Sequence, residues 1–159
     1  MTETMDPETL MRHAIEAARR GIESQQSPFG CAIARGDELL VACHNIVWQS
    51  TDITAHAEVT ALRAACRKTK QIMLDDCMVA TTCEPCPMCA SALHWARVHT
   101  VYYGATIADA ADAGFNELQI DAATLLRSGG SRVILRSGVL PDECKLLFSI
   151  WKARSGDAY

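Results

Sequence analysis

Two short stretches of this chain, thirty residues apart, place the strongest constraint on its fold. The first contains His56 and Glu58, and the second contains Cys86 and Cys89. One imidazole and two thiolates are the ligand set of a zinc site whose fourth position stays open for water, and Glu58 adds a carboxylate beside it. The chain must therefore fold so that these two stretches meet at one point.

Sequence patterns place each stretch at the start of a helix. Residues 55–66 form an alanine- and leucine-rich run with His56 in its first turn, and Glu84-Pro85 suits the N-terminus of a second helix over 86–97. An apolar strand over 76–82 lies between them. A helix and a strand are long enough to bring the two helix starts side by side, where their partial positive charge favours thiolate over thiol.

The rest of the chain also alternates helices and strands. We expect residues 45–53 to be irregular and residues 106–116 to be too poor in large apolar side chains to enter the core. The other elements that we expect are an amphipathic helix from Asp6-Pro7 to about residue 22, strands over 31–34, 39–43, 98–104 and 132–135, and helices over 118–126 and 141–154. This order predicts an α/β protein, a three-layer α/β/α sandwich with a five-stranded mixed sheet.

Composition indicates how many domains the chain forms, which partners it binds and in which compartment it works. With 159 residues, of which 49% are hydrophobic, the chain can bury one core, so we expect a single domain over 1–159. The formal charge of −4 gives no general attraction to phosphate backbones, so we expect no nucleic-acid partner. No apolar run is long enough for a membrane span, and the polar, acidic start has no signal-peptide pattern. We therefore expect a cytoplasmic protein with no membrane partner.

Eight cysteines in a reducing compartment are metal ligands or small apolar side chains rather than disulfides. We assign Cys86 and Cys89 to the metal and expect the others to be buried. These others are Cys31, Cys43, Cys66, Cys77, Cys83 and Cys144.

The expected chemistry is hydrolytic removal of an amino group. A zinc ion with three protein ligands lowers the pKa of its water toward about 7, so that a hydroxide can attack the ring carbon that bears the amine. Glu58 would take the water proton, deliver it to a ring nitrogen and then protonate the leaving amine, which departs as ammonia. The alternative is a structural zinc site closed by a fourth ligand such as Cys83, or no metal at all, but neither explains Glu58.

The combination H-x-E followed by P-C-x-x-C resembles the cytidine deaminase-like superfamily over most of the chain. Within it, the sequence most resembles bacterial guanine deaminases. The phrases that carry this closer resemblance are Pro28-Phe29-Gly30, the stretch 54–61, Cys83-Glu84-Pro85-Cys86-Pro87-Met88-Cys89, Trp95-Ala96-Arg97 and the stretch 109–115. The resemblance implies a free nucleobase as substrate, most simply guanine converted to xanthine and ammonia.

The resemblance also implies a set of substrate-binding residues. Asn45 would hydrogen-bond the base, Phe29 would stack near its ring, and Ala57 and Trp95 would line the pocket. Tyr159 would close the pocket of a partner, because the C-terminal segment, about 140–159, is exchanged between the subunits of a homodimer in such enzymes. The alternatives are a turn-capping role for Asn45, core packing for the two aromatic rings, and a frayed end for Tyr159.

The sequence departs from the guanine deaminases just after Gly114-Phe115. Those enzymes carry two acids there, whereas this chain has Asn116-Glu117. A carboxylate is therefore kept only at the second position, Glu117, where the side chain is one methylene longer than in those enzymes. Glu117 could still accept hydrogen bonds from guanine N1 and the 2-amino group, but the added length could also favour another aminopurine, a pterin or a triazine. A solvated carboxylate on a loop is the simpler alternative.

Three other functions compete with this prediction. A tRNA adenosine deaminase shares both zinc motifs, and a cluster of basic residues could serve it, although the tail 155–159 carries no base. That cluster consists of Arg63, Arg67, Lys68 and Lys70. A deaminase of cytosine or cytidine is the second competitor, and a catalytically silent, zinc-stabilised binding module is the third.

Overall fold

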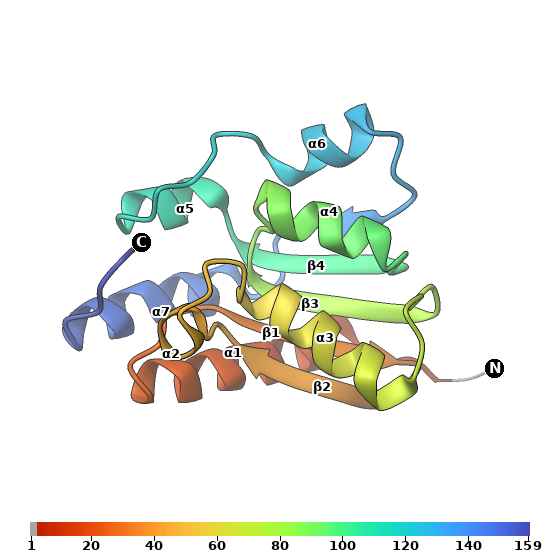
Figure 1. Cartoon of the computed structure of the whole chain (residues 1–159), viewed down its shortest axis with the longest axis horizontal. Coiled ribbons are helices and arrows are strands. Elements are labelled where there is room, and N and C mark those ends of the chain that lie inside the picture. The colour runs from red at the N-terminus through yellow and green to blue at the C-terminus, as the bar shows by residue number, and fades with distance from the viewer. Residues whose placement is uncertain (1–2) are drawn as a thin grey trace.

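The computed structural model describes residues 3–159 and has five strands with helices on both sides (Figure 1). The strands are β1 (Gly30–Arg35), β2 (Glu38–His44), β3 (Cys77–Cys83), β4 (Thr100–Ala105) and β5 (Ile134–Arg136). The helices are α1 (Pro7–Glu23), α2 (Val47–Ser50), α3 (Ala57–Thr69), α4 (Pro87–Trp95), α5 (Ile107–Asp112), α6 (Ala122–Ser128) and α7 (Pro141–Ala153).

The strands form one mixed sheet in the order β2-β1-β3-β4-β5. β1 is antiparallel to both β2 and β3, whereas β3, β4 and β5 run parallel to one another. The carboxyl ends of β3 and β4 therefore lie at one edge of the sheet, and Cys83 at the end of β3 pairs with Ala105 at the end of β4. The predicted five-stranded mixed sheet is confirmed.

Helices cover both faces of this sheet. α1 and α7 pack together on one face, where Leu10, Met11 and Leu147 are fully buried. α3 and α4 lie side by side on the other face, where Ala61 and Leu93 are part of a second apolar cluster (Figure 1). The three-layer α/β/α sandwich is also confirmed, and it leaves the starts of α3 and α4 near each other.

Local sequence signals account for the first helix. The Asp6 side chain accepts a hydrogen bond from Thr9 N at 3.0 Å, and Pro7 occupies the first helical position. Gly30 at the start of β1 has no room for a side chain, because a Cβ there would collide with the backbone of Ala14 on α1. The absence of this side chain allows α1 to lie directly on the sheet.

The segment after β4 differs from the prediction. α5 forms within it, closed by a capping box between Thr106 and Asp109, and it buries Ile107. Phe115 is buried as well and packs on Trp151 with ring centroids 5.0 Å apart. The prediction that residues 106–116 stay out of the core is therefore wrong. Phe115 is buried because Trp151 of α7 supplies the opposing surface.

Other differences concern boundaries. The short helix α2 forms within 45–53, which we expected to be irregular, and α6 begins at Ala122 rather than at 118.

Within the part of the chain described, residues 3–159, no helix combines the length and the apolar character that crossing a membrane requires.

Candidate metal centre and active site

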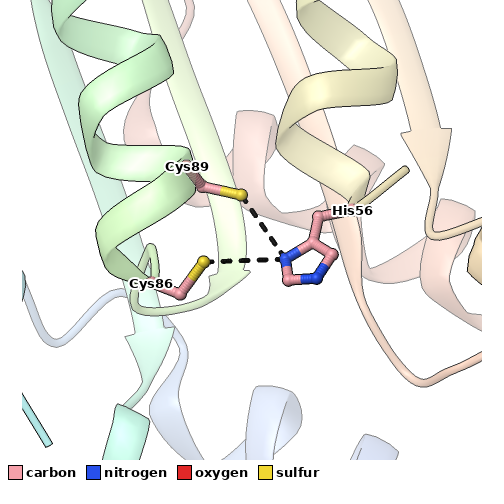
Figure 2. Close-up of side chains that lie close together, drawn as sticks. All are labelled: His56, Cys86 and Cys89. Carbon is pink, nitrogen blue, oxygen red and sulfur yellow. Dashed lines mark hydrogen bonds between the residues drawn. The ribbon is translucent and has the colours of Figure 1, made fainter. Parts of the chain in front are cut away.

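His56, Cys86 and Cys89 meet at the starts of α3 and α4 (Figure 2). His56 Nδ1 lies 3.6 Å from Cys86 Sγ and 3.5 Å from Cys89 Sγ, and the three ligand atoms lie within 4.8 Å of one another. Tetrahedral zinc with Zn–N of about 2.05 Å and Zn–S of about 2.3 Å separates nitrogen from sulfur by about 3.6 Å. The three side chains therefore already have the spacing that a zinc ion requires.

Helix geometry explains why the three side chains converge. His56 and Cys86 are the extended N-cap residues of α3 and α4, and Cys89 lies in the first turn of α4. Pro87 at the first position of α4 fixes the backbone where the chain enters the helix. Each ligand thus projects from the positive end of a helix, as the sequence predicted.

The two thiols differ in acidity. The pKa of Cys86 is lowered to about 4, chiefly because the thiol of Cys89 hydrogen-bonds to it, with His56 adding a further hydrogen bond. The same contact with Cys86, together with burial, raises the pKa of Cys89 well above its ordinary value. Cys86 is therefore the thiol that ionises more readily, and a bound metal would take both sulfurs as thiolates.

Glu58 lies beside this group on the first turn of α3, with only 6% of the residue exposed. Burial raises the pKa of its carboxyl, and the negative charge of Cys86 acts in the same direction. Thr81 on β3 donates a hydrogen bond from Oγ1 to Glu58 Oε1 at 3.0 Å. Sequence reasoning missed Thr81, although the two hydroxyl residues Thr81 and Thr82 near the end of an otherwise apolar strand, just before the metal motif, were a usable signal.

A small cavity of about 30 Å³ lies next to Glu58 and the metal ligands. Such a volume holds no more than a few water molecules. The residues that line it are Phe29, Asn45, His56, Glu58, Cys83, Glu84, Cys86, Phe115, Glu117 and Tyr159. The structure thus brings Phe29, Asn45, Glu117 and Tyr159 together from four distant parts of the sequence, whereas Cys83, Glu84 and Phe115 had no predicted role in a pocket.

Asn45 is fully buried and already makes two hydrogen bonds. Its Oδ1 accepts from Val47 N at 3.0 Å, and its Nδ2 donates to the hydroxyl of Tyr159 at 2.6 Å. The amide oxygen is therefore already bound by the backbone of α2, and one N–H of the amide is left without a partner among these bonds. That Asn45 offers a donor and an acceptor together to a base stays a prediction.

Glu117 is half-buried, and its carboxyl faces both the inner cavity and a larger outer chamber of about 280 Å³. Burial, followed by the negative charge of Cys86, raises the pKa of Glu117 to about 7. The outer chamber is more apolar and is lined by Ile53, Met88 and Leu118 among others. A solvated surface position for Glu117, the simpler alternative, does not fit this burial.

Tyr159 covers the inner cavity. Its ring lies 5.7 Å from the ring of His56 and 5.3 Å from that of Phe115, centroid to centroid. Asn116 N also donates to Tyr159 O at 3.2 Å, so the end of the chain is held against the same segment as Glu117. The described chain end is packed into the site rather than frayed.

Two predicted residues lie elsewhere. Trp95 is 81% exposed at the C-terminal end of α4, the end opposite Cys86, and lines none of the cavities beside the metal ligands. The expectation that Trp95 lines the pocket is therefore not met within this chain. Ala57 is fully buried in the apolar cluster between α3 and the sheet, so its side chain does not line these cavities either.

The alternative of a closed, structural metal site finds no support. Cys83 ends β3 as expected, but its Sγ donates to Thr106 O at 3.4 Å. Among residues 3–159, the group able to hold a metal at this site consists of His56, Cys86 and Cys89. Three ligands leave a tetrahedral ion with an open position, which is the arrangement of catalytic rather than structural zinc.

Residues 4–105 match the family model described as the cytidine and deoxycytidylate deaminase zinc-binding region. The chain belongs to this family of zinc-dependent deaminases. Its cofactor is zinc, its chemistry is that of an aminohydrolase, and the superfamily resemblance found in the sequence is confirmed.

Similar proteins include both guanine and tRNA deaminases. A guanine deaminase of Bacillus subtilis (strain 168) is 44% identical over 114 residues, which are 71% of this chain and 73% of that protein. A tRNA-specific adenosine deaminase of Aquifex aeolicus (strain VF5) is 36% identical over 101 residues, 64% of this chain and 67% of that protein. The solved structure of a guanine deaminase from Nitrosomonas europaea has a TM-score of 0.86 at 26% identity and covers 95% of this chain and 87% of that one.

Proposed function

We propose that this protein converts guanine and water to xanthine and ammonia. The observation that carries the proposal is the pairing of an amide donor, Asn45, with a carboxyl, Glu117, in the same small cavity as Glu58 and the metal ligands. Similarity to guanine deaminases in sequence and in structure supports it.

The hydrogen-bonding groups of the cavity fit the edges of guanine. N1–H and the 2-amino group are adjacent donors, which a carboxylate at Glu117 can accept, whereas O6 and N7 are acceptors. The amide oxygen of Asn45 is bound by Val47 N, so the second N–H of Asn45 is the group that would donate to an acceptor atom of the ligand. The aromatic rings of Phe29 and Tyr159 would contact the faces of the base and exclude water.

His56, Cys86 and Cys89 would hold the zinc ion. When bound, zinc supplies acidification of a water molecule at neutral pH. Glu58 would hold the proton released from this water on its carboxylate, pass it to a ring nitrogen of guanine and then protonate the departing amine. Thr81 keeps the Glu58 carboxylate in place by its hydrogen bond to Oε1.

A tRNA adenosine deaminase is the second candidate, because one relative with that function shares 36% of the matched residues. The basic residues of α3 argue against it. Arg63 pairs with Asp52 and Lys68 with Glu38, so two of the four positive charges are offset by acids. Nucleic-acid affinity from a chain of net charge −4 would need a stronger basic surface.

The deciding experiment measures ammonia release by the zinc-loaded protein. Guanine, adenine, cytosine, cytidine, a pterin, an aminotriazine and an adenosine-containing tRNA anticodon stem are offered side by side. We expect guanine to have the highest kcat/KM and Glu58→Ala to abolish turnover while zinc content and thermal unfolding remain unchanged. Preference for another base would refute the substrate, and no turnover of any of them would refute the enzymatic proposal.

We also propose a cytoplasmic homodimer that exchanges its C-terminal segment, about residues 140–159. The eight free cysteines fit a reducing compartment, and Tyr159, which lines the cavity of its own chain in this structure, would line the partner's cavity after an exchange. Mixing Glu58→Ala chains with chains that lack residues 155–159 tests the exchange. A swapped dimer regains activity in the mixture, because the intact tail completes the site of the truncated chain; an unswapped dimer does not.

A further inference from the structure

Glu84 is a buried carboxylate that the chemistry above does not use. It stands between Cys83, the last residue of β3, and Pro85-Cys86, and only 7% of it is exposed. None of the ion pairs within residues 3–159 includes it. A buried carboxylate without a cation must be stabilised by hydrogen bonds.

Two backbone amides provide these hydrogen bonds. Ile107 N donates to Glu84 Oε1 at 3.1 Å, and Ala122 N donates to Glu84 Oε2 at 2.8 Å. Ile107 is the first residue of α5 and Ala122 is the first residue of α6. One carboxylate therefore caps two helices at once, 23 and 38 residues away in the sequence.

The residues that cap these two helices locally do not bind the first amide of either helix. Thr106 accepts from Asp109 N and Asp121 accepts from Thr124 N, so each local cap serves the third amide of its helix. The first amide of each helix has no intrahelical partner, and Glu84 accepts both. Its negative charge also faces the positive ends of two helices.

The two bonds fix both ends of one segment, from Ile107 to Ala122. This segment carries Phe115 and Glu117, which line the cavity beside the metal ligands. Glu84 N further donates to Ala105 O at 2.8 Å, just before the segment begins. The backbone of Glu84 is joined to Cys86 through Pro85, whose restricted φ leaves little freedom between them.

We propose that Glu84 is a positioning residue for base recognition: by holding the starts of α5 and α6 it sets where Phe115 and Glu117 stand relative to Cys86. The metal motif thus contains, beside its thiolates, the anchor of the segment that reads the base. This part of the inference rests on the proposed function, because it takes Glu117 as the group that contacts the substrate. The anchoring of α5 and α6 by Glu84 does not depend on the proposed function.

Glu84→Gln tests the inference with little change in size. The amide keeps one acceptor but turns an NH₂ group toward the other helix amide, so one bond is replaced by two opposed donors. We expect KM for guanine to rise at least tenfold while kcat changes less than threefold and zinc stays at one per chain. Hydrogen–deuterium exchange should accelerate at residues 107–122 and stay unchanged in α3 and α4.

Asp121→Ala is the matched control, because it removes a local cap of α6 and leaves the hydrogen bond from Ala122 N to Glu84 in place. It should loosen α6 alone and leave KM unchanged. Unchanged exchange at 107–122 in Glu84→Gln would overturn the anchoring, even if the wild-type protein deaminates guanine. If the wild type prefers another base, the exchange experiment still decides the anchoring and KM is measured with that base. Loss of zinc with normal exchange would show that Glu84 serves the metal loop and would also overturn the inference.

Discussion

Protonation of Glu117 should control substrate capture in the range around neutral pH. In the proposed complex its carboxylate accepts hydrogen bonds from two donors of guanine, so only the ionised form is competent. Burial and the charge of Cys86 raise the pKa of Glu117 to about 7. Guanine itself does not titrate near this pH. Acidification through pH 7 should therefore weaken capture of the base, and the loss should belong to kcat/KM, which reports the free enzyme.

The size of the effect follows from the titration. A carboxyl with a pKa of about 7 is roughly nine-tenths ionised at pH 8 and roughly one-tenth ionised at pH 6. We expect kcat/KM for guanine to fall about tenfold between these values. Glu117→Gln should lose about 1.5–3 kcal/mol, the net worth of a hydrogen bond to a charged group, which is roughly 10- to 150-fold in kcat/KM at pH 8.

The assay is a pH series of initial rates from 5.5 to 8.5, with zinc content measured at each pH. The decisive comparison is between the wild type and Glu117→Gln, because an amide cannot titrate and the fall near pH 7 should vanish in the variant. Any pH dependence of kcat/KM that arises from Glu58 would persist in both the wild type and Glu117→Gln. A wild-type profile that is flat from pH 6 to 8, or a variant that keeps the same fall, would refute the assignment of Glu117 to the base.

Three further perturbations test other contacts of the site. Thr81→Val removes the hydroxyl that donates to Glu58 and should lower kcat by about 10- to 100-fold with zinc retained, whereas Thr81→Ser should keep most of the activity. Cys86→Ala should abolish zinc binding in metal analysis, and Cys83→Ala should leave one zinc per chain. Tyr159→Phe deletes the hydroxyl that accepts from the buried amide, which costs about 1 kcal/mol and should lower Tm by about 2–4 °C in calorimetry. An unchanged kcat, retained zinc or an unchanged Tm, respectively, would contradict these expectations.

The metal centre could be predicted from sequence because local rules determine it. His56 and Cys86 are N-caps of helices whose starts the sequence marks with apolar runs and prolines, and the parallel pairing of β3 with β4 follows from the strand–helix–strand order. Spacing within each motif then sets the orientation of the ligands. These are short-range features, so one sequence is enough to find them.

The pocket wall depends instead on contacts between distant segments. Phe115 is buried because Trp151 of α7 packs against it, and Glu84 finds its partners 23 and 38 residues away. Neither relation leaves a periodic pattern in the sequence. Trp95 is the opposite case: a short phrase that resembles a family suggested a pocket residue, but within this chain its place at the C-terminal end of α4 leaves it exposed to solvent.

These contacts also explain why the site is almost closed. Tyr159 accepts one of the two N–H groups of the Asn45 amide and covers a cavity of about 30 Å³, which has no room for a bicyclic base. The second N–H of the Asn45 amide stays free for the substrate, but a base can reach it only when the tail moves away from the cavity. The outer chamber of about 280 Å³ adjoins Tyr159 and Glu117, so it is the natural first stop for the incoming base. In the proposed mechanism, base selection would then begin at Glu117, a position at which this chain departs from the guanine deaminases it resembles, before the base meets the metal centre.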